Sequence, residues 1–69
     1  MKGLQIGDFG HFIFIIEYHG MTYKNDMEGL EVTDMDHHNI WLTGMDDSVY
    51  NVRKMNVELF EKQDKPQVR

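Results

Sequence analysis

The sequence has no cysteine, no alanine and a single proline among its 69 residues. The lack of cysteine excludes disulfides and thiolate metal sites as ways of bracing the core. The lack of alanine removes the strongest helix former, which favours a β fold. A chain of this length forms one domain and buries only about 60% of its unfolded surface, so we expect a thin core that profits from a partner or from oligomerisation.

Basic residues are missing from the middle of the chain, and the formal net charge is −5. No Lys or Arg occurs between Lys24 and Arg53, whereas acidic residues are frequent there: Asp26, Glu28, Glu31, Asp34, Asp36, Asp46 and Asp47. Binding to DNA or to anionic membranes depends on Lys and Arg, so the overall charge argues against both. The acidic surface suits solubility, a basic protein partner or mimicry of nucleic acid, and solubility is the simplest of the three.

No segment is apolar over the length needed to cross a bilayer, and the N-terminus lacks the pattern of a signal peptide. We therefore expect a cytoplasmic protein without membrane contacts. Its small size, acidity and many methionines resemble products of phage or mobile-element genes.

The most hydrophobic run spans residues 11–18, and it predicts a central strand that is apolar on both faces. Phe12, Phe14 and Ile16 fall on one side of this strand, whereas Ile13 and Ile15 fall on the other. Turn residues flank the run, and a two-residue hairpin is expected at residues 19–20.

Further strands are predicted at residues 30–33, 40–43, 49–52 and 57–61, with a short additional strand at 4–6. Residues 24–28 are expected to loop or bulge before a bend at Gly29, and residues 34–39 form a polar turn in which Asn39 tolerates a left-handed backbone. The predicted fold is all-β: a small five-stranded antiparallel SH3-like barrel over residues 1–61, with a disordered tail at 62–69. The predicted core comprises Phe12, Phe14, Ile16, Leu30, Val32, Ile40, Leu42, Val52, Val57 and Leu59.

The segment 18–60 resembles the Sm and Sm-like family of small barrels. Gly29, Asn39 and Leu42 match the spacing of that family's first motif, and residues 52–57 are similar to its second motif. The resemblance implies a ring that binds single-stranded RNA, in which His37, Asn39 and Arg53 would hold a base. The sequence departs from the family at Lys54, which replaces a glycine, at Asp36, which is one place away from the usual Asp, and in having no predicted N-terminal helix.

Residues that carry chemistry are few. Asp34, Asp36, His37 and His38 have side chains that ligate metals, but two adjacent histidines in an extended chain point in opposite directions, so a solvated turn is the preferred interpretation. Ser48 is the only serine, and no nucleophile elbow or phosphate-binding glycine loop is present. We therefore expect neither an enzyme nor a bound cofactor or metal.

Trp41, Tyr50 and Phe60 are predicted to lie opposite the core positions of their strands. They form either a second small core layer or an exposed aromatic patch that binds a protein. The function predicted from the sequence is a non-enzymatic protein-protein interaction module that acts through this aromatic face or through a strand edge and binds a protein partner or its own copies. The alternative is an Sm-like RNA-binding protein.

Overall fold

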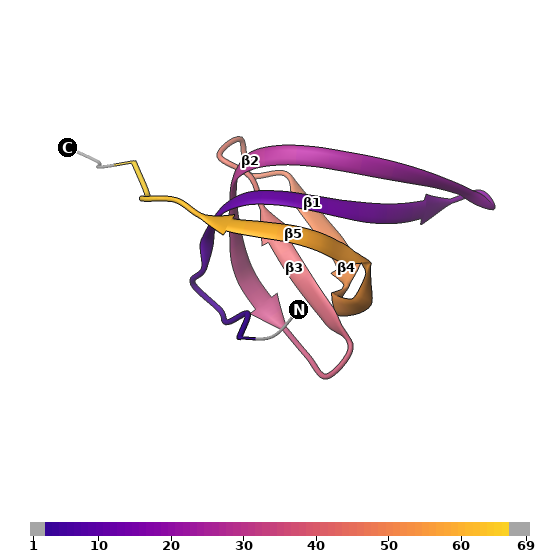
Figure 1. Cartoon of the computed structure of the whole chain (residues 1–69), viewed down its shortest axis with the longest axis horizontal. Coiled ribbons are helices and arrows are strands. Elements are labelled where there is room, and N and C mark those ends of the chain that lie inside the picture. Colours follow the sequence, from indigo (N-terminus) through magenta and orange to yellow (C-terminus); the bar gives the residue numbers. More distant parts are fainter. Residues whose placement is uncertain (1–2, 67–69) are drawn as a thin grey trace.

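A computed structural model describes residues 3–66 and shows an all-β protein. Five antiparallel strands form one sheet in the order β4-β3-β2-β1-β5 (Figure 1). A 3-10 turn, η1 (Lys54–Asn56), connects the last two strands. The strands are β1 (Phe9–Tyr18), β2 (Met21–Met35), β3 (Asn39–Thr43), β4 (Val49–Arg53) and β5 (Val57–Lys62).

This strand order, with a 3-10 turn before the last strand, confirms the predicted small SH3-like fold. The sheet curls so that β1 approaches β4 across the core. It remains open, because within residues 3–66 no ladder joins the two edge strands β4 and β5. The sheet is therefore curved like the predicted barrel, but hydrogen bonds between β4 and β5 do not close it.

The core lies on the concave side of the sheet and contains eight of the ten residues predicted for it. Ile16 and Leu59 are half-buried instead, and the sequence analysis missed Phe9, which is buried at the start of β1. The buried apolar residues are Phe9, Phe12, Phe14, Leu30, Val32, Ile40, Leu42, Val52 and Val57.

The loop predicted at residues 24–28 is wrong, because this segment belongs to β2. Strand β2 is 15 residues long, and its residues from Met21 to Met27 pair with β1 without a break. The polar residues there predicted a loop, but they are strand residues whose solvent-facing side chains need no apolar character. A bend does occur at Gly29, where two residues of β2 stand opposite His11 in a bulge and Gly29 has a φ of 74°.

The polar turn after β2 is shorter than predicted, and Asn39 does not adopt a left-handed backbone. Asn39 begins β3, and Asp36 closes the turn by accepting hydrogen bonds from the backbone N–H groups of His38 (2.9 Å) and Asn39 (2.8 Å). Because the Asp36 side chain satisfies these donors, no residue of the turn needs a positive φ. Among the described residues other than glycine, only His19 and Asp47 have positive φ values.

Both ends of the chain differ from the predictions. Residues 4–6 form no strand; this segment ends in a turn, and Gly7 and Asp8 exchange backbone hydrogen bonds with Val32. Lys62 belongs to β5, and residues 63–66 follow without regular structure, although the Gln63 N–H donates to the Phe9 carbonyl (2.9 Å). The rest of the predicted tail, residues 67–69, lies outside the described part of the chain, as do residues 1–2.

Candidate functional site

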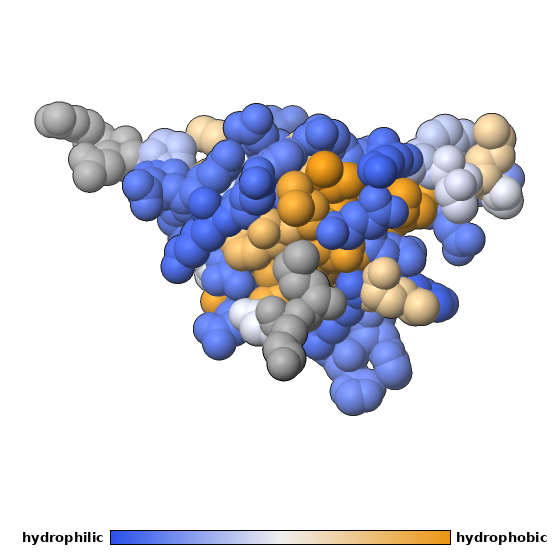
Figure 2. All heavy atoms as spheres, viewed as in Figure 1, coloured by the Kyte–Doolittle hydropathy of each residue, from blue (hydrophilic) through white to orange (hydrophobic). Residues whose placement is uncertain are grey.

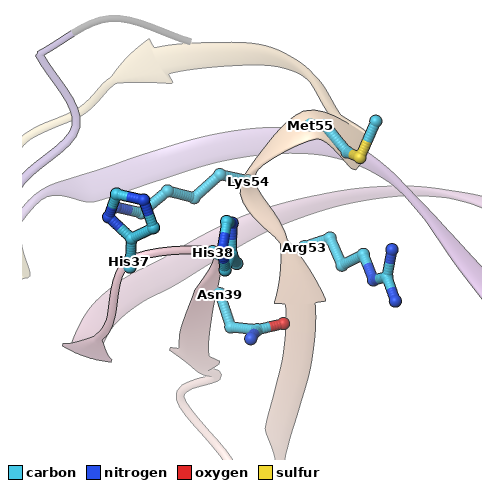
Figure 3. A pocket seen from close by; sticks show the side chains of 6 residues that line it. All are labelled: His37, His38, Asn39, Arg53, Lys54 and Met55. Carbon is cyan, nitrogen blue, oxygen red and sulfur yellow. The ribbon is translucent and has the colours of Figure 1, made fainter.

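A pocket of about 500 Å³ lies between the turn after β2 and the junction of β4 with η1 (Figure 3). Cationic and hydrogen-bonding side chains dominate its lining, which consists of His37, His38, Asn39, Arg53, Lys54 and Met55. Asn39 and Arg53 are partners in the β3–β4 register, and the Lys54 N–H donates to the His38 carbonyl (2.9 Å), so the two walls are tied together by backbone hydrogen bonds.

His37, Asn39 and Arg53 thus lie around one pocket, although 16 positions separate the first from the last in the sequence. The rings of His37 and His38 meet edge to face at 4.4 Å, and the Lys54 side chain extends towards His37, whereas Arg53 points away to the other side (Figure 3). Asn39 and Arg53 also line a second hollow of about 310 Å³ beside the outer half of β1. Arg53 is therefore available to a ligand that spans both hollows.

Two acidic side chains accept hydrogen bonds within turns: Asp36 beside this pocket, and Asp46 in the turn between β3 and β4. Hydrogen bonds from the backbone N–H groups of Asn39 and His38 lower the pKa of the Asp36 carboxyl below its ordinary value. Hydrogen bonds from Ser48 similarly lower the pKa of Asp46 in the next turn. No group of three or more Asp, Glu, His or Cys side chains among residues 3–66 is arranged to hold a metal ion.

The three aromatic residues predicted to form one face do not share a face. Tyr50 packs against the core, with its ring 6.0 Å from that of Phe14, and Phe60 does the same at 4.7 Å from Phe12. Trp41 lies on the other side of β3, because its neighbours Ile40 and Leu42 both point into the core.

Two physical reasons explain this correction. Tyr50 stands two residues from the buried Val52 on the same strand, so both point to the core. In β5 a bulge at Glu58 inserts one residue, so Phe60 pairs with the core residue Phe12, and Leu59 pairs with Ile13 on the opposite face. The sequence analysis assumed unbroken alternation in β5.

The convex face of β1 is covered by charged side chains. His11 contacts Asp26 of β2 at 2.5 Å and Glu61 of β5 at 2.9 Å, and Lys24 of β2 pairs with Glu58 of β5 at 3.0 Å. These pairs connect the strands on either side of β1, and they leave Ile13 and Ile15 half-buried. Figure 2 shows hydrophobic residues exposed between hydrophilic ones on the face in view.

The outer part of the β1–β2 hairpin projects from the body of the protein as a two-stranded arm, residues 15–27 (Figure 1). β5 pairs with β1 only as far as Phe14, and β3 pairs with β2 only from Glu31 onwards. Within residues 3–66, no further strand therefore pairs with either edge of the arm. The arm ends in a tight turn in which His19 (φ 51°) and Gly20 (φ 76°) both have a positive φ. This is the geometry of the predicted two-residue hairpin.

The face of the arm that continues the core carries exposed apolar side chains. Tyr18, Met21 and Tyr23 are 62%, 58% and 45% exposed, and all three belong to the cross-strand pairs that lie on the same face as Phe12 and Phe14. The Tyr23 hydroxyl donates to the Met21 sulfur (3.6 Å), and the Tyr18 ring lies 4.1 Å from that of His19. Sequence reasoning missed this site because it assigned part of the arm to a loop.

Comparisons with known protein families, with curated proteins and with solved structures found no match to this chain. Within residues 3–66 no helix has the length and apolar character required to cross a membrane.

Proposed function

We propose that this protein is a non-enzymatic interaction module that binds a protein partner along the free β2 edge of the arm. One observation carries this proposal: the arm presents an unpaired strand edge next to exposed apolar side chains, Tyr18, Met21 and Tyr23. Unpaired backbone donors and acceptors bind an extended strand of another chain, and the neighbouring side chains add specificity. The aromatic residues Trp41, Tyr50 and Phe60 are not needed, since they do not form one surface.

The free edge can be blocked without disturbing the arm. The turn at residues 19–20 makes Tyr18 and Met21 a hydrogen-bonded pair, so the N–H groups of Tyr23 and Asn25 point to β1 and those of Thr22, Lys24 and Asp26 point to the free edge. Lys24→Pro therefore removes an outward donor while it leaves the pairing with β1 in place. Lys24→Ala is the matched control, because it loses the same side chain but keeps the N–H group.

Each form of the full chain is used as bait in an extract of the source cell, and captured proteins are quantified by mass spectrometry. We expect a partner to be captured by the wild type and by Lys24→Ala and to be lost with Lys24→Pro. The proposal fails if no protein is captured specifically and the chain does not self-associate, or if Lys24→Pro captures the same partner as the control.

A second candidate function is binding of single-stranded RNA at the pocket of His37, Asn39 and Arg53. It is supported by the position of these three residues around one pocket beside Lys54, in a protein that is otherwise acidic. Guanidinium and ammonium groups bind phosphate, and imidazole rings stack on bases.

A fluorescence titration with a single-stranded oligoribonucleotide at low salt tests this candidate, since electrostatic binding is strongest there. Arg53→Ala should weaken binding by about tenfold, the equivalent of one charge-assisted hydrogen bond. Lys2→Ala, a change of the same charge far from the pocket in sequence, serves as the control. Absence of binding to the wild type at low salt eliminates RNA binding.

A further inference from the structure

We propose that the partner of the free β2 edge is a second copy of this chain, and that the two β2 strands pair antiparallel about a twofold axis at Asn25. This inference rests on the proposed function, because it uses the same edge. It specifies the partner, the register and the residues that face each other across the axis.

The backbone allows only some registers of such a pair. Strands that pair antiparallel bond through residues whose N–H and C=O groups point towards the new neighbour, and here these are Thr22, Lys24 and Asp26. An outward-pointing residue must therefore stand opposite another outward-pointing residue. Within the arm, the twofold axis then passes through Tyr23, Lys24, Asn25 or Asp26.

Charge distinguishes these four registers. An axis at Lys24 or at Asp26 places two like charges directly opposite each other, which is unfavourable. An axis at Tyr23 leaves both Lys24 residues without an acidic partner across the strands, because Lys24 then faces Thr22. An axis at Asn25 places Lys24 of each copy opposite Asp26 of the other. These two complementary charge pairs add to the contacts that Lys24 makes with Glu58 and Asp26 makes with His11 within each copy.

The same register also matches the apolar side chains. With the axis at Asn25, Tyr23 of each copy stands opposite Met27 of the other, and aromatic rings pack favourably against methionine sulfur. Met21 of one copy lies at the level of Gly29 in the other copy. The exposed Met45 side chain lies beside Gly29, with its sulfur 3.1 Å from the position that a Cβ of Gly29 would take. Side chains that are exposed in one copy are thus covered by the second copy.

Disulfide trapping tests the register directly. Asn25 faces itself across the axis in a pair that is not hydrogen-bonded, for which the Cα–Cα distance is about 4.5 Å, close enough for a disulfide. The natural chain has no cysteine, so Asn25→Cys introduces a single thiol. Thr22→Cys is the control, because the two copies of residue 22 would lie roughly 20 Å apart along the strands.

We expect mild oxidation of the full chain to give covalent dimer with Asn25→Cys and little with Thr22→Cys. Sedimentation equilibrium of the wild type should show a monomer–dimer equilibrium. Lys24→Asp should weaken it by about tenfold or more, because two attractive pairs become repulsive. The double variant Lys24→Asp with Asp26→Lys should restore the dimer, and circular dichroism should show that every variant remains folded.

A wild type that stays monomeric at all concentrations, or equal cross-linking of the two cysteine variants, overturns the self-pairing. So does a double variant that dimerises no better than Lys24→Asp. In these cases a different protein that is captured by the wild type and lost with Lys24→Pro still supports the proposed function, so the two failures are distinguishable.

Discussion

At the scale of single residues, His11 is the titrating group with the most specific environment. Its Nδ1 lies 2.9 Å from a Glu61 carboxylate oxygen and its Nε2 lies 2.5 Å from an Asp26 oxygen, so both ring nitrogens donate when the imidazole is protonated. The Glu61 hydrogen bond, followed by the Asp26 hydrogen bond, raises the pKa of His11 above its ordinary value of 6.5. The charged imidazolium is therefore the form that holds β2, β1 and β5 together.

This arrangement predicts how stability depends on pH. A raised pKa in the folded state means that His11 stabilises the fold fully below its unfolded pKa of about 6.5, and that this contribution is lost as the pH rises through the folded pKa. We expect the wild type to lose stability relative to His11→Gln as the pH rises from about 6.5 through the raised folded-state pKa of His11. Urea unfolding of both proteins across this range measures the difference, in which the other three histidines cancel. Parallel pH profiles would contradict the prediction.

Strand β3 allows the stability contribution of a half-buried residue, Trp41, to be compared with that of its fully buried neighbours. Trp41 is half-buried on the convex side of β3, between the fully buried Ile40 and Leu42. We expect Trp41→Ala to cost about 1 kcal/mol of unfolding free energy, whereas Ile40→Ala should cost about 2–5 kcal/mol because it leaves a core cavity. Chemical denaturation of the two variants provides the comparison. A cost for Trp41→Ala equal to that of Ile40→Ala would assign Trp41 to the core.

At the scale of the elements, the contact between β1 and β5 depends on the absence of a side chain at Gly10. A Cβ at this position would lie 2.0 Å from the Glu61 carbonyl oxygen, which belongs to the backbone of β5 and cannot rotate away. We expect Gly10→Ala to displace β5 and to destabilise the protein by about 1–3 kcal/mol or more. Gly20→Asn is the control, because asparagine tolerates the positive φ of a hairpin turn.

Thermal unfolding followed by circular dichroism measures both glycine variants. Hydrogen exchange adds a local measurement, since the displaced strand should lose protection in β5 before the β2–β3–β4 part of the sheet does. If Gly10→Ala melts at the wild-type temperature, the close approach of the two strands does not limit stability.

At the scale of the whole molecule, stability depends on a small set of apolar side chains. A chain of this length is stabilised by roughly 3–10 kcal/mol, and truncation of a fully buried Phe costs about 3–5 kcal/mol. We expect Phe14→Ala to be largely unfolded at 37 °C, whereas Tyr18→Ala should change the unfolding free energy by less than about 0.5 kcal/mol, because Tyr18 is 62% exposed on the arm. Denaturant titration distinguishes the two variants, and a marginal effect of Phe14→Ala would show that the core is not the main source of stability.

The sequence by itself determined the all-β class, the five strands and most of the core, because period-two alternation and turn residues are local properties of the chain. It also marked His37, Asn39 and Arg53 through a resemblance to a known family. Their meeting around one pocket was decided by the pairing of β3 with β4, which joins residues 14 positions apart.

Only the tertiary structure decided which faces and edges remain exposed. The bulge at Glu58 turns Phe60 towards the core and Leu59 to the opposite face, and an inserted residue of this kind leaves no sign in the alternation pattern. The polar segment 24–28 is part of a strand because its residues 24–27 pair with β1, and composition does not reveal this pairing. The arm and its free edge exist because β3 and β5 end their pairing before β1 and β2 do, and pairing between strands that are distant in the sequence is not recorded in any local pattern.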